Sequence, residues 1–153
     1  ILKNYVSKNF ILIFPFCSSK NANKKWPFYN ELIAILKFKH KNLEVVVSPG
    51  PNELDEAKKI NATVILNNNN ILNIMQLSGL VKKSNFVIAN DTGPAHIAAH
   101  LGKEGVVLFG SHTTPKKVSI ETNNFKAIKV KNLSLLTPEE VYLSVKSKLD
   151  LIN

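Results

Sequence analysis

Five short apolar runs recur along this chain, and each ends in a turn of polar or small residues. The runs are rich in Val, Ile, Leu and Phe, which is typical of parallel strands buried on both faces. The segments between them have the spacing of amphipathic helices. We expect strands at 9–14, 43–47, 62–66, 85–89 and 105–109, and helices at 26–39, 53–59, 72–82, 95–101 and 137–150.

This alternation of strand and helix predicts one α/β domain over residues 1–153. A weaker alternating segment at 125–130 adds an edge-like sixth strand, so we expect a Rossmann-like, doubly wound, mostly parallel sheet. Ligands of such sheets bind beyond the carboxyl ends of the strands. The loops expected at that end are 15–25, 48–52, 67–70, 90–93 and 110–114, with loop structure continuing to residue 118.

The turn after the fourth strand carries the most distinctive chemistry. From Asn90 to His96 it reads Asn-Asp-Thr-Gly-Pro-Ala-His. Thr92 or Gly93 suits the N-cap of the next helix, and Pro94 suits its first position. Free backbone amides at the positive end of the helix dipole would then face outward, where phosphate binds. A tight strand-to-helix connection without ligand uses the same residue types, so both interpretations stay open.

Other candidates lie at the same predicted edge. Lys24 precedes the first helix, where it either reaches a phosphate or is solvated. We expect Asn52 to cap a short helix, and Glu53 either complements its dipole or binds ribose hydroxyls. His96 and His100 share one helix face but lack the glutamate of a zinc H-E-x-x-H site. We therefore expect no metal, with His96 beside the phosphate site and His100 partly buried.

Composition and sequence motifs exclude several functional classes of protein. The net charge is +9, and all twenty basic residues are lysines. They are scattered and lack interleaved aromatics, so we expect no nucleic-acid partner; a phosphate-bearing ligand or an anionic membrane surface accounts for the charge equally well.

The single Cys17, interpreted as a small buried residue, indicates a reducing compartment. No Walker loop or G-x-G-x-x-G is present. The chain begins at Ile1 rather than Met, so we expect a piece of a longer protein.

Four ordered blocks between Phe10 and Pro115 resemble the C-terminal half of family 9 glycosyltransferases, the ADP-heptose:lipopolysaccharide heptosyltransferases. The blocks are Ser18-Ser19…Lys24-Lys25-Trp26-Pro27, Gly50…Glu53…Glu56-Ala57, Asn90-Asp91-Thr92-Gly93-Pro94-x-His96-x-Ala98-Ala99-x-Leu101-Gly102 and Val106-Val107-Leu108-Phe109-Gly110…Thr113…Pro115. Their order and near-family spacing make the resemblance specific. The chain departs from it in using Lys for Arg throughout, and in having Lys103-Glu104-Gly105 where a proline usually precedes the fifth strand.

The resemblance implies the donor-binding half of a two-domain GT-B fold, without its N-terminal acceptor domain and general base. It implies inverting transfer from an ADP-sugar, ADP-heptose above all, to a lipopolysaccharide core or related lipid-linked glycan. No metal or other cofactor is expected. The implied location is the cytoplasm, compatible with peripheral contact at the anionic inner face of the inner membrane. The alternatives are a stand-alone nucleotide-binding or regulatory domain and the donor half of a GT-B sugar epimerase.

The resemblance also implies roles for individual residues. Lys24 would pair with the pyrophosphate as a point charge. Glu53 would hold the ribose, and Asp91 would meet the donor sugar. The remaining implied contacts are Ser18, Ser19 and the Thr92 and Gly93 amides at the phosphates, Ile71 and Leu72 at the adenine, and His96 beside the phosphates.

Overall fold

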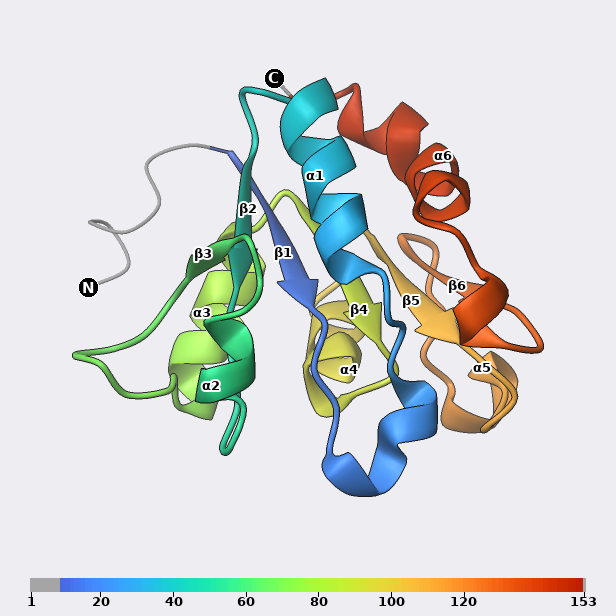
Figure 1. The fold of residues 1–153 in the computed structure, drawn as a ribbon, viewed down its shortest axis with the longest axis horizontal. Helices are drawn as coiled ribbons and strands as arrows, with labels where there is room; N and C mark the ends of the chain where they lie inside the picture. The colour runs from blue at the N-terminus through green and yellow to red at the C-terminus, as the bar shows by residue number, and fades with distance from the viewer. Residues whose placement is uncertain (1–8, 153) are drawn as a thin grey trace.

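A computed structural model describes residues 9–152 and contains one six-stranded sheet (Figure 1). The strand order is β3-β2-β1-β4-β5-β6, and every neighbouring pair is parallel. The strands are β1 (Phe10–Phe14), β2 (Glu44–Val47), β3 (Thr63–Val64), β4 (Phe86–Asn90), β5 (Gly105–Phe109) and β6 (Phe125–Lys129). The predicted doubly wound sheet is thereby confirmed, with β6 at one edge.

The central strand β1 determines where the site can form. On one side Leu12 pairs with Val46 of β2, and on the other it pairs with Val87 of β4. The chain thus runs outward in one direction through β2 and β3, and in the other through β4, β5 and β6. The strand order reverses between β1 and β4, and ligands of doubly wound sheets bind at such a switch point.

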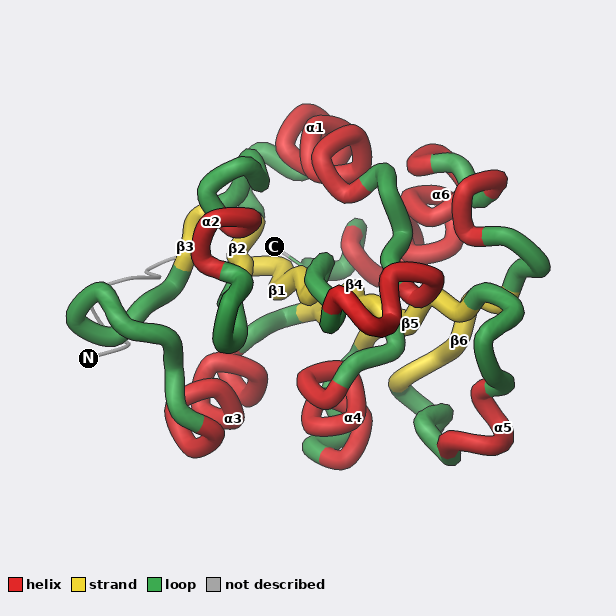
Figure 2. Tube along the Cα trace, turned by 60° about the horizontal axis from the view of Figure 1, so that its bottom comes forward, coloured by secondary structure: helices red, strands yellow, loops and turns green. Residues whose placement is uncertain are grey.

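Helices cover both faces of the sheet (Figure 2). One face carries α1 (Tyr29–Lys39), α2 (Leu54–Ala57) and α6 (Pro138–Leu149). The other carries α3 (Ile74–Lys83), α4 (Gly93–His100) and α5 (Pro115–Val118). Short 3₁₀ segments, η2 (Ser19–Lys24) and η3 (Leu133–Leu135), complete the chain.

Two apolar cores result from this three-layer arrangement. Along β1, Ile11 and Ile13 belong to the core under α1 and α6, whereas Leu12 and Phe14 belong to the core over α3 and α4. All five residues of β1 are buried, because successive side chains alternate between two covered faces. This is why the strand reads as a continuous apolar run rather than as an alternation.

Several predicted element boundaries were wrong. The helix expected from residue 26 begins at Tyr29. Asn52 does not cap α2: it has a left-handed backbone (φ 66°), and Glu53 occupies the N-cap position. The loop expected at 111–118 ends in α5, because the Thr114 side chain accepts a bond from the Lys117 N–H.

Helix caps account for other boundaries. The last helix was expected from residue 137, and Thr137 is the N-cap of α6, where it forms a capping box with Glu140. A second capping box, between Asn73 and Gln76, starts α3 and was not predicted. The loop expected at 15–25 contains η2, where the Ser18 side chain accepts a bond from the Lys20 N–H. None of the helices between residues 9 and 152 has the length and apolar character that a bilayer crossing requires.

Candidate functional site

A cleft of about 460 Å³ opens at the carboxyl ends of β1 and β4, within the size range of small-molecule sites. Three loops and the start of α4 surround it. Its lining residues are Phe14, Phe16, Cys17, Ser18, Asn21, Lys24, Ser48, Pro49, Gly50, Pro51, Glu53, Leu72, Ile74, Leu77, Asp91, Thr92, Gly93 and Pro94. The predicted convergence of the loops at 15–25, 48–52 and 90–93 is therefore observed.

Asn90 at the end of β4 is fully buried and ties two of these loops together. Its Oδ1 accepts bonds from the Trp26 N–H and the Tyr29 hydroxyl, each at 3.1 Å, and its Nδ2 donates to the Pro15 carbonyl at 2.8 Å. Burial raises the pKa of Tyr29 well above its ordinary value, so this hydroxyl stays protonated and can donate. The strand end is thus fixed relative to the segment that follows β1.

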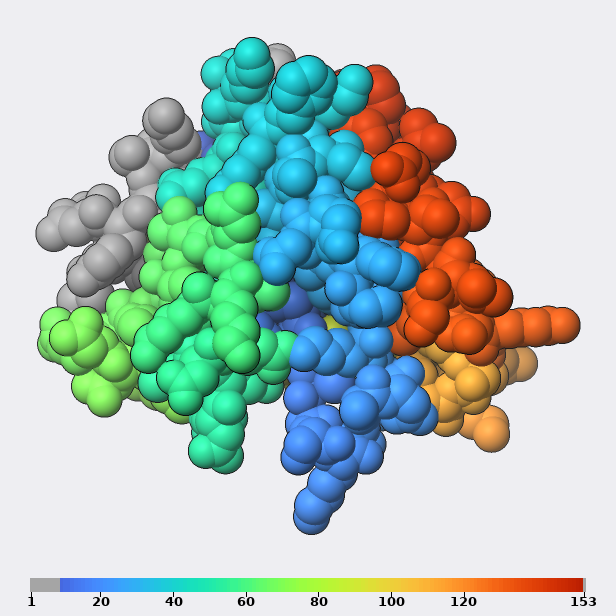
Figure 3. Space-filling model, viewed as in Figure 1, coloured from blue at the N-terminus to red at the C-terminus, as the bar shows by residue number. Residues whose placement is uncertain are grey.

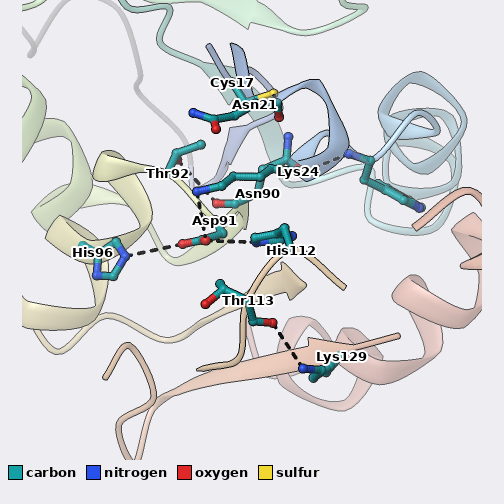
Figure 4. A network of polar contacts seen from close by, with 11 residues as sticks. Cys17, Asn21, Lys24, Asn90, Asp91, Thr92, His96, His112, Thr113 and Lys129 are labelled. Atoms are coloured by element: carbon teal, nitrogen blue, oxygen red, sulfur yellow. Dashed lines mark hydrogen bonds and ion pairs between the residues drawn. The ribbon is translucent and has the colours of Figure 1, made fainter. Parts of the chain in front are cut away.

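Asp91, the next residue, lies among three side chains that can donate to it, with His96 and His112 on either side (Figure 4). His112 Nε2 is 3.0 Å from Oδ2, Lys24 Nζ is 3.5 Å from Oδ2, and His96 Nε2 is 3.4 Å from Oδ1. The carboxylate is almost completely buried, while Lys24 and His96 retain about 28% and 33% side-chain exposure. A buried carboxylate therefore faces two partners that remain accessible to a ligand.

The amino end of α4 adds an anion-binding surface beside Asp91. Thr92, one of the two predicted N-cap residues, occupies the N-cap without a side-chain bond. Because α4 begins at Gly93, Pro94 takes the second helical position rather than the predicted first. The N–H groups of Ala95 and His96 donate to the Thr92 carbonyl. The Thr92 and Gly93 N–H groups donate to no group within residues 9–152. Unused amides at a helix amino end are a site for phosphate or another anion.

Glu53 lines the same cleft. Its Oε2 accepts a bond of 2.7 Å from the Gly50 N–H, and its Oε1 has no hydrogen-bond partner within residues 9–152. A Cβ on Gly50 would lie 3.1 Å from Oε2, so a larger residue would crowd this carboxylate. Burial raises the pKa of Glu53, opposed by the Gly50 N–H and by Lys25. Glu53 is therefore a held, partly desolvated acceptor suited to hydroxyl donors.

A second hollow of about 470 Å³ adjoins the cleft between η2 and α2, where Figure 3 shows the surface indented. Cys17, Ser18 and Glu53 line both spaces, and Ser19 lines only this second one. Lys25 also lies here and pairs with Glu56 rather than with the Asp91 cluster.

The structure brings most of the predicted site residues together. Those that line the cleft are Ser18, Lys24, Glu53, Leu72, Asp91, Thr92 and Gly93. His96 stands beside Asp91, but Ser19 lies in the adjoining hollow and Ile71 is not part of the cleft wall.

Two predictions about burial were wrong. His100 is exposed rather than partly buried, because its ring turns back to the His96 carbonyl at 2.7 Å instead of packing on a neighbour. Cys17 is only partly buried and lines the cleft, with its Sγ 3.3 Å from the Asn21 carbonyl. Burial nevertheless raises the pKa of this thiol.

His112 was missed by sequence reasoning. It lies in the predicted 110–114 loop, and its ring stacks on Phe109 with centroids 5.5 Å apart and planes 12° apart. A single histidine in a loop carries no spacing signal, so only the three-dimensional contact with Asp91 distinguishes it. Within residues 9–152, no group of three or more His, Cys, Asp or Glu residues is arranged to hold a metal ion.

The chemistry of the cleft follows from two kinds of lining residue. Phe14, Phe16, Leu72 and Leu77 supply an apolar wall suited to a flat or aliphatic group. Lys24 and the α4 amides supply an anion site, and Glu53 supplies an acceptor for hydroxyls. The arrangement suits a ligand that combines an apolar ring, hydroxyl groups and a phosphate.

Known proteins share both sequence and fold with this chain. Residues 2–141 match the sequence profile of Glycosyltransferase family 9 (heptosyltransferase). The lipopolysaccharide core heptosyltransferase OpsX of Haemophilus influenzae is 36% identical over 111 residues, covering 69% of this chain and 31% of OpsX.

The structural comparisons agree on the fold. The E. coli heptosyltransferase WaaC with ADP matches with a TM-score of 0.79 at 20% identity, over 96% of this chain and 47% of WaaC. The UDP-GlcNAc 2-epimerase of Neisseria meningitidis bound to UDP-GlcNAc matches with a TM-score of 0.62 at 17% identity, over 97% of this chain and 38% of the epimerase.

The chain thus spans about a third of OpsX and about half of WaaC. The structural matches by themselves establish the shared α/β fold alone. The profile match covers most of the residues, including every loop of the cleft, and it establishes the family: this chain belongs to glycosyltransferase family 9, the heptosyltransferases.

Proposed function

We propose that this chain is the donor-binding part of a heptosyltransferase and that its cleft binds an ADP-sugar, with ADP-heptose as the expected donor. The observation that carries the proposal is the convergence of Lys24, the unused α4 amides and Glu53 on one cleft at the β1–β4 switch point. WaaC has been solved with ADP and with ADP-2-deoxy-2-fluoro heptose, which supports the adenine nucleotide.

The diphosphate lies against the amino end of α4 in this proposal. Lys24 Nζ is partly exposed at the cleft and supplies the positive charge. The Thr92 and Gly93 amides donate to phosphate oxygens, and the hydroxyl of Ser18, which lines the same cleft, contacts the diphosphate from the loop after β1. Backbone dipoles and one lysine then stabilise the leaving diphosphate, the task that a metal ion performs in other enzymes.

The nucleoside lies toward β2 and α3. Glu53, which lines the cleft, accepts from the ribose hydroxyls through Oε1, while the Gly50 N–H holds Oε2. Leu72 belongs to the apolar wall on which the adenine ring packs. Because the anion site and the apolar residues line one cleft, the diphosphate and the base can be held at the same time.

Asp91 contacts the hydroxyls of the donor sugar, with His96 at its side. A carboxylate aimed at the diphosphate without a cation would repel it, so the sugar is the part of the ligand that a carboxylate can favour.

The transfer of the sugar is inverting in this proposal. Residues 1–153 act as one donor-binding unit, while the general base and acceptor site belong to an N-terminal half outside it. The acceptor is the lipopolysaccharide core or a related lipid-linked glycan, reached at the cytoplasmic face of the inner membrane.

Titration calorimetry tests the proposal on the chain as it stands. We expect ADP and ADP-heptose to bind in the presence of a chelator, with modest affinity, because a closing second domain would bury the other side of the ligand. UDP and UDP-GlcNAc serve as matched ligands and should bind more weakly. Preference for the uridine ligands would favour an epimerase-like half, and a requirement for magnesium would overturn the metal-free site.

A further inference from the structure

The proposed donor contacts leave His112 without a role, although it is among the most buried groups near the cleft. Its side chain is 4% exposed and its Nε2 lies 3.0 Å from Asp91 Oδ2. The ring is held flat against Phe109 at the end of β5. His112 does not line the cleft itself, so it would act on a ligand there through a group that it contacts, and Asp91 is such a group that lines the cleft.

The geometry of the ring indicates which nitrogen carries the proton. A nitrogen that faces a carboxylate oxygen at 3.0 Å must donate, so Nε2 bears hydrogen. Nδ1 is buried and has no hydrogen-bond partner within residues 9–152. An N–H there would be an unsatisfied buried donor. The ring is therefore best described as the neutral form with its proton on Nε2.

The two oxygens of Asp91 have different partners. Oδ2 is shared by His112, which is fixed by burial and stacking, and by Lys24, which is partly exposed at the cleft. Oδ1 faces His96. If Lys24 turns toward a ligand, Asp91 keeps a donor at each oxygen, and a buried carboxylate is not left without partners.

We propose that His112 is a positioning residue that holds Asp91 through its Nε2 hydrogen and so allows Lys24 to exchange Asp91 for the phosphate of a bound nucleotide. This inference rests on the proposed function. Without the His112 donor, Lys24 becomes the remaining partner of Asp91 Oδ2 and is held there more firmly. Nucleotide binding then has to break that ion pair, and the affinity falls.

Two variants separate donation from packing. His112→Phe keeps a ring that can stack on Phe109 but has no donor, whereas His112→Gln loses the ring and can place an amide N–H near the position of Nε2. We expect His112→Phe to weaken ADP binding about 10-fold, the scale of one hydrogen bond to a charged group. His112→Gln should recover most of that loss. The reverse order, with Gln the weaker binder, would show that packing matters and would overturn the proposal.

A double-mutant cycle with Asp91 isolates the coupling. In the Asp91→Asn background, His112→Phe should change ADP affinity less than about 2-fold, because the uncharged side chain no longer holds Lys24. An undiminished 10-fold effect in that background would contradict the proposal. Nitrogen-15 NMR of the imidazole ring in the parent chain adds an independent readout, with hydrogen expected on Nε2 and none on Nδ1.

Failure of this inference differs from failure of the proposed function. If the parent chain binds no ADP, the proposed function fails. If the parent binds ADP and both His112 variants bind it equally well, only the role of His112 fails. Thermal unfolding of each variant identifies any that is misfolded, and the NMR tautomer still tests the proposal if His112→Phe is unstable.

Discussion

Asn90 and Asp91 are neighbours in the chain, both are buried, and their surroundings differ in kind. Asn90 is bonded to groups that cannot leave: the Trp26 N–H, the Pro15 carbonyl and the hydroxyl of the buried Tyr29. Asp91 faces the ends of three side chains, and two of them, Lys24 and His96, are partly exposed.

The comparison shows how one strand end can serve two purposes. A buried polar group whose partners are fixed contributes to the fold, because its bonds are made once and persist. A buried charge whose partners can move is available for exchange with a ligand. The alternation of side chains along and beyond β4 separates the two functions by a single residue.

The largest expected effect comes from Asn90. Asn90→Ala removes three hydrogen bonds and leaves a buried hydroxyl, an N–H and a carbonyl without their partner. We expect the free energy of unfolding to fall by about 3 kcal/mol, measured by urea denaturation. Tyr29→Phe removes one of the three bonds and should lower it by about 1 kcal/mol. Equal and small losses in the two variants would mean that Asn90 does not hold these loops.

Asp91→Asn is the matched change on the other side of the comparison. It should leave thermal unfolding nearly unchanged and spare ADP affinity, while weakening the intact ADP-sugar by about 2 kcal/mol, the scale of a charged hydrogen bond. Calorimetry with both ligands on the one variant measures this difference. If Asp91 only braces the turn through local bonds, ADP and ADP-sugar binding would fall together and the melting temperature would drop.

Glu53 extends the comparison to the second carboxylate of the cleft, with a smaller effect. Burial raises the pKa of Glu53, so the folded protein favours the protonated side chain over the carboxylate. The stability that the protonated form contributes is fully present below the ordinary pKa of about 4.3 and is lost as pH rises through the raised pKa. Glu53→Gln has no such loss. We expect its unfolding free energy to exceed that of the parent by a few tenths of a kcal/mol at pH 7, since the group is half-exposed. Below about pH 4 the difference should disappear. If the unfolding free energies of the parent and Glu53→Gln changed in parallel with pH, the result would contradict this prediction.

The fold could be predicted because its main signals are local. Strands buried on both faces read as apolar runs, and Thr137 with Pro138 and Glu140 marks the start of α6. The errors occur where local signals are weak or absent. The four-residue helix α5 depends on one cap at Thr114. The alanine-rich helix α4 gives little indication of which face is buried, so His100 was misplaced.

The site could be predicted only in part for a related reason. Lys24 and Asp91 stand in turns at strand ends, where the topology brings turns together. The bonds of Asn90 join residues 61 to 75 positions apart, and no spacing rule connects them. His112 depends on the stacking of its ring against Phe109 and on a contact across 21 positions. Such contacts become visible only in the folded chain.

The central claim is that the cleft at the β1–β4 switch binds a nucleotide diphosphate through Lys24. Calorimetry of ADP with the parent, Lys24→Ala and Lys25→Ala, in the presence of a chelator, tests it most directly. Lys25 is the matched control, because it is the next residue and pairs with Glu56 outside the Asp91 cluster. We expect Lys24→Ala to weaken ADP binding by about 1–3 kcal/mol with unfolding unchanged, and Lys25→Ala to matter less. Equal affinity of the parent and Lys24→Ala would contradict the account and make Lys24 an ordinary surface lysine.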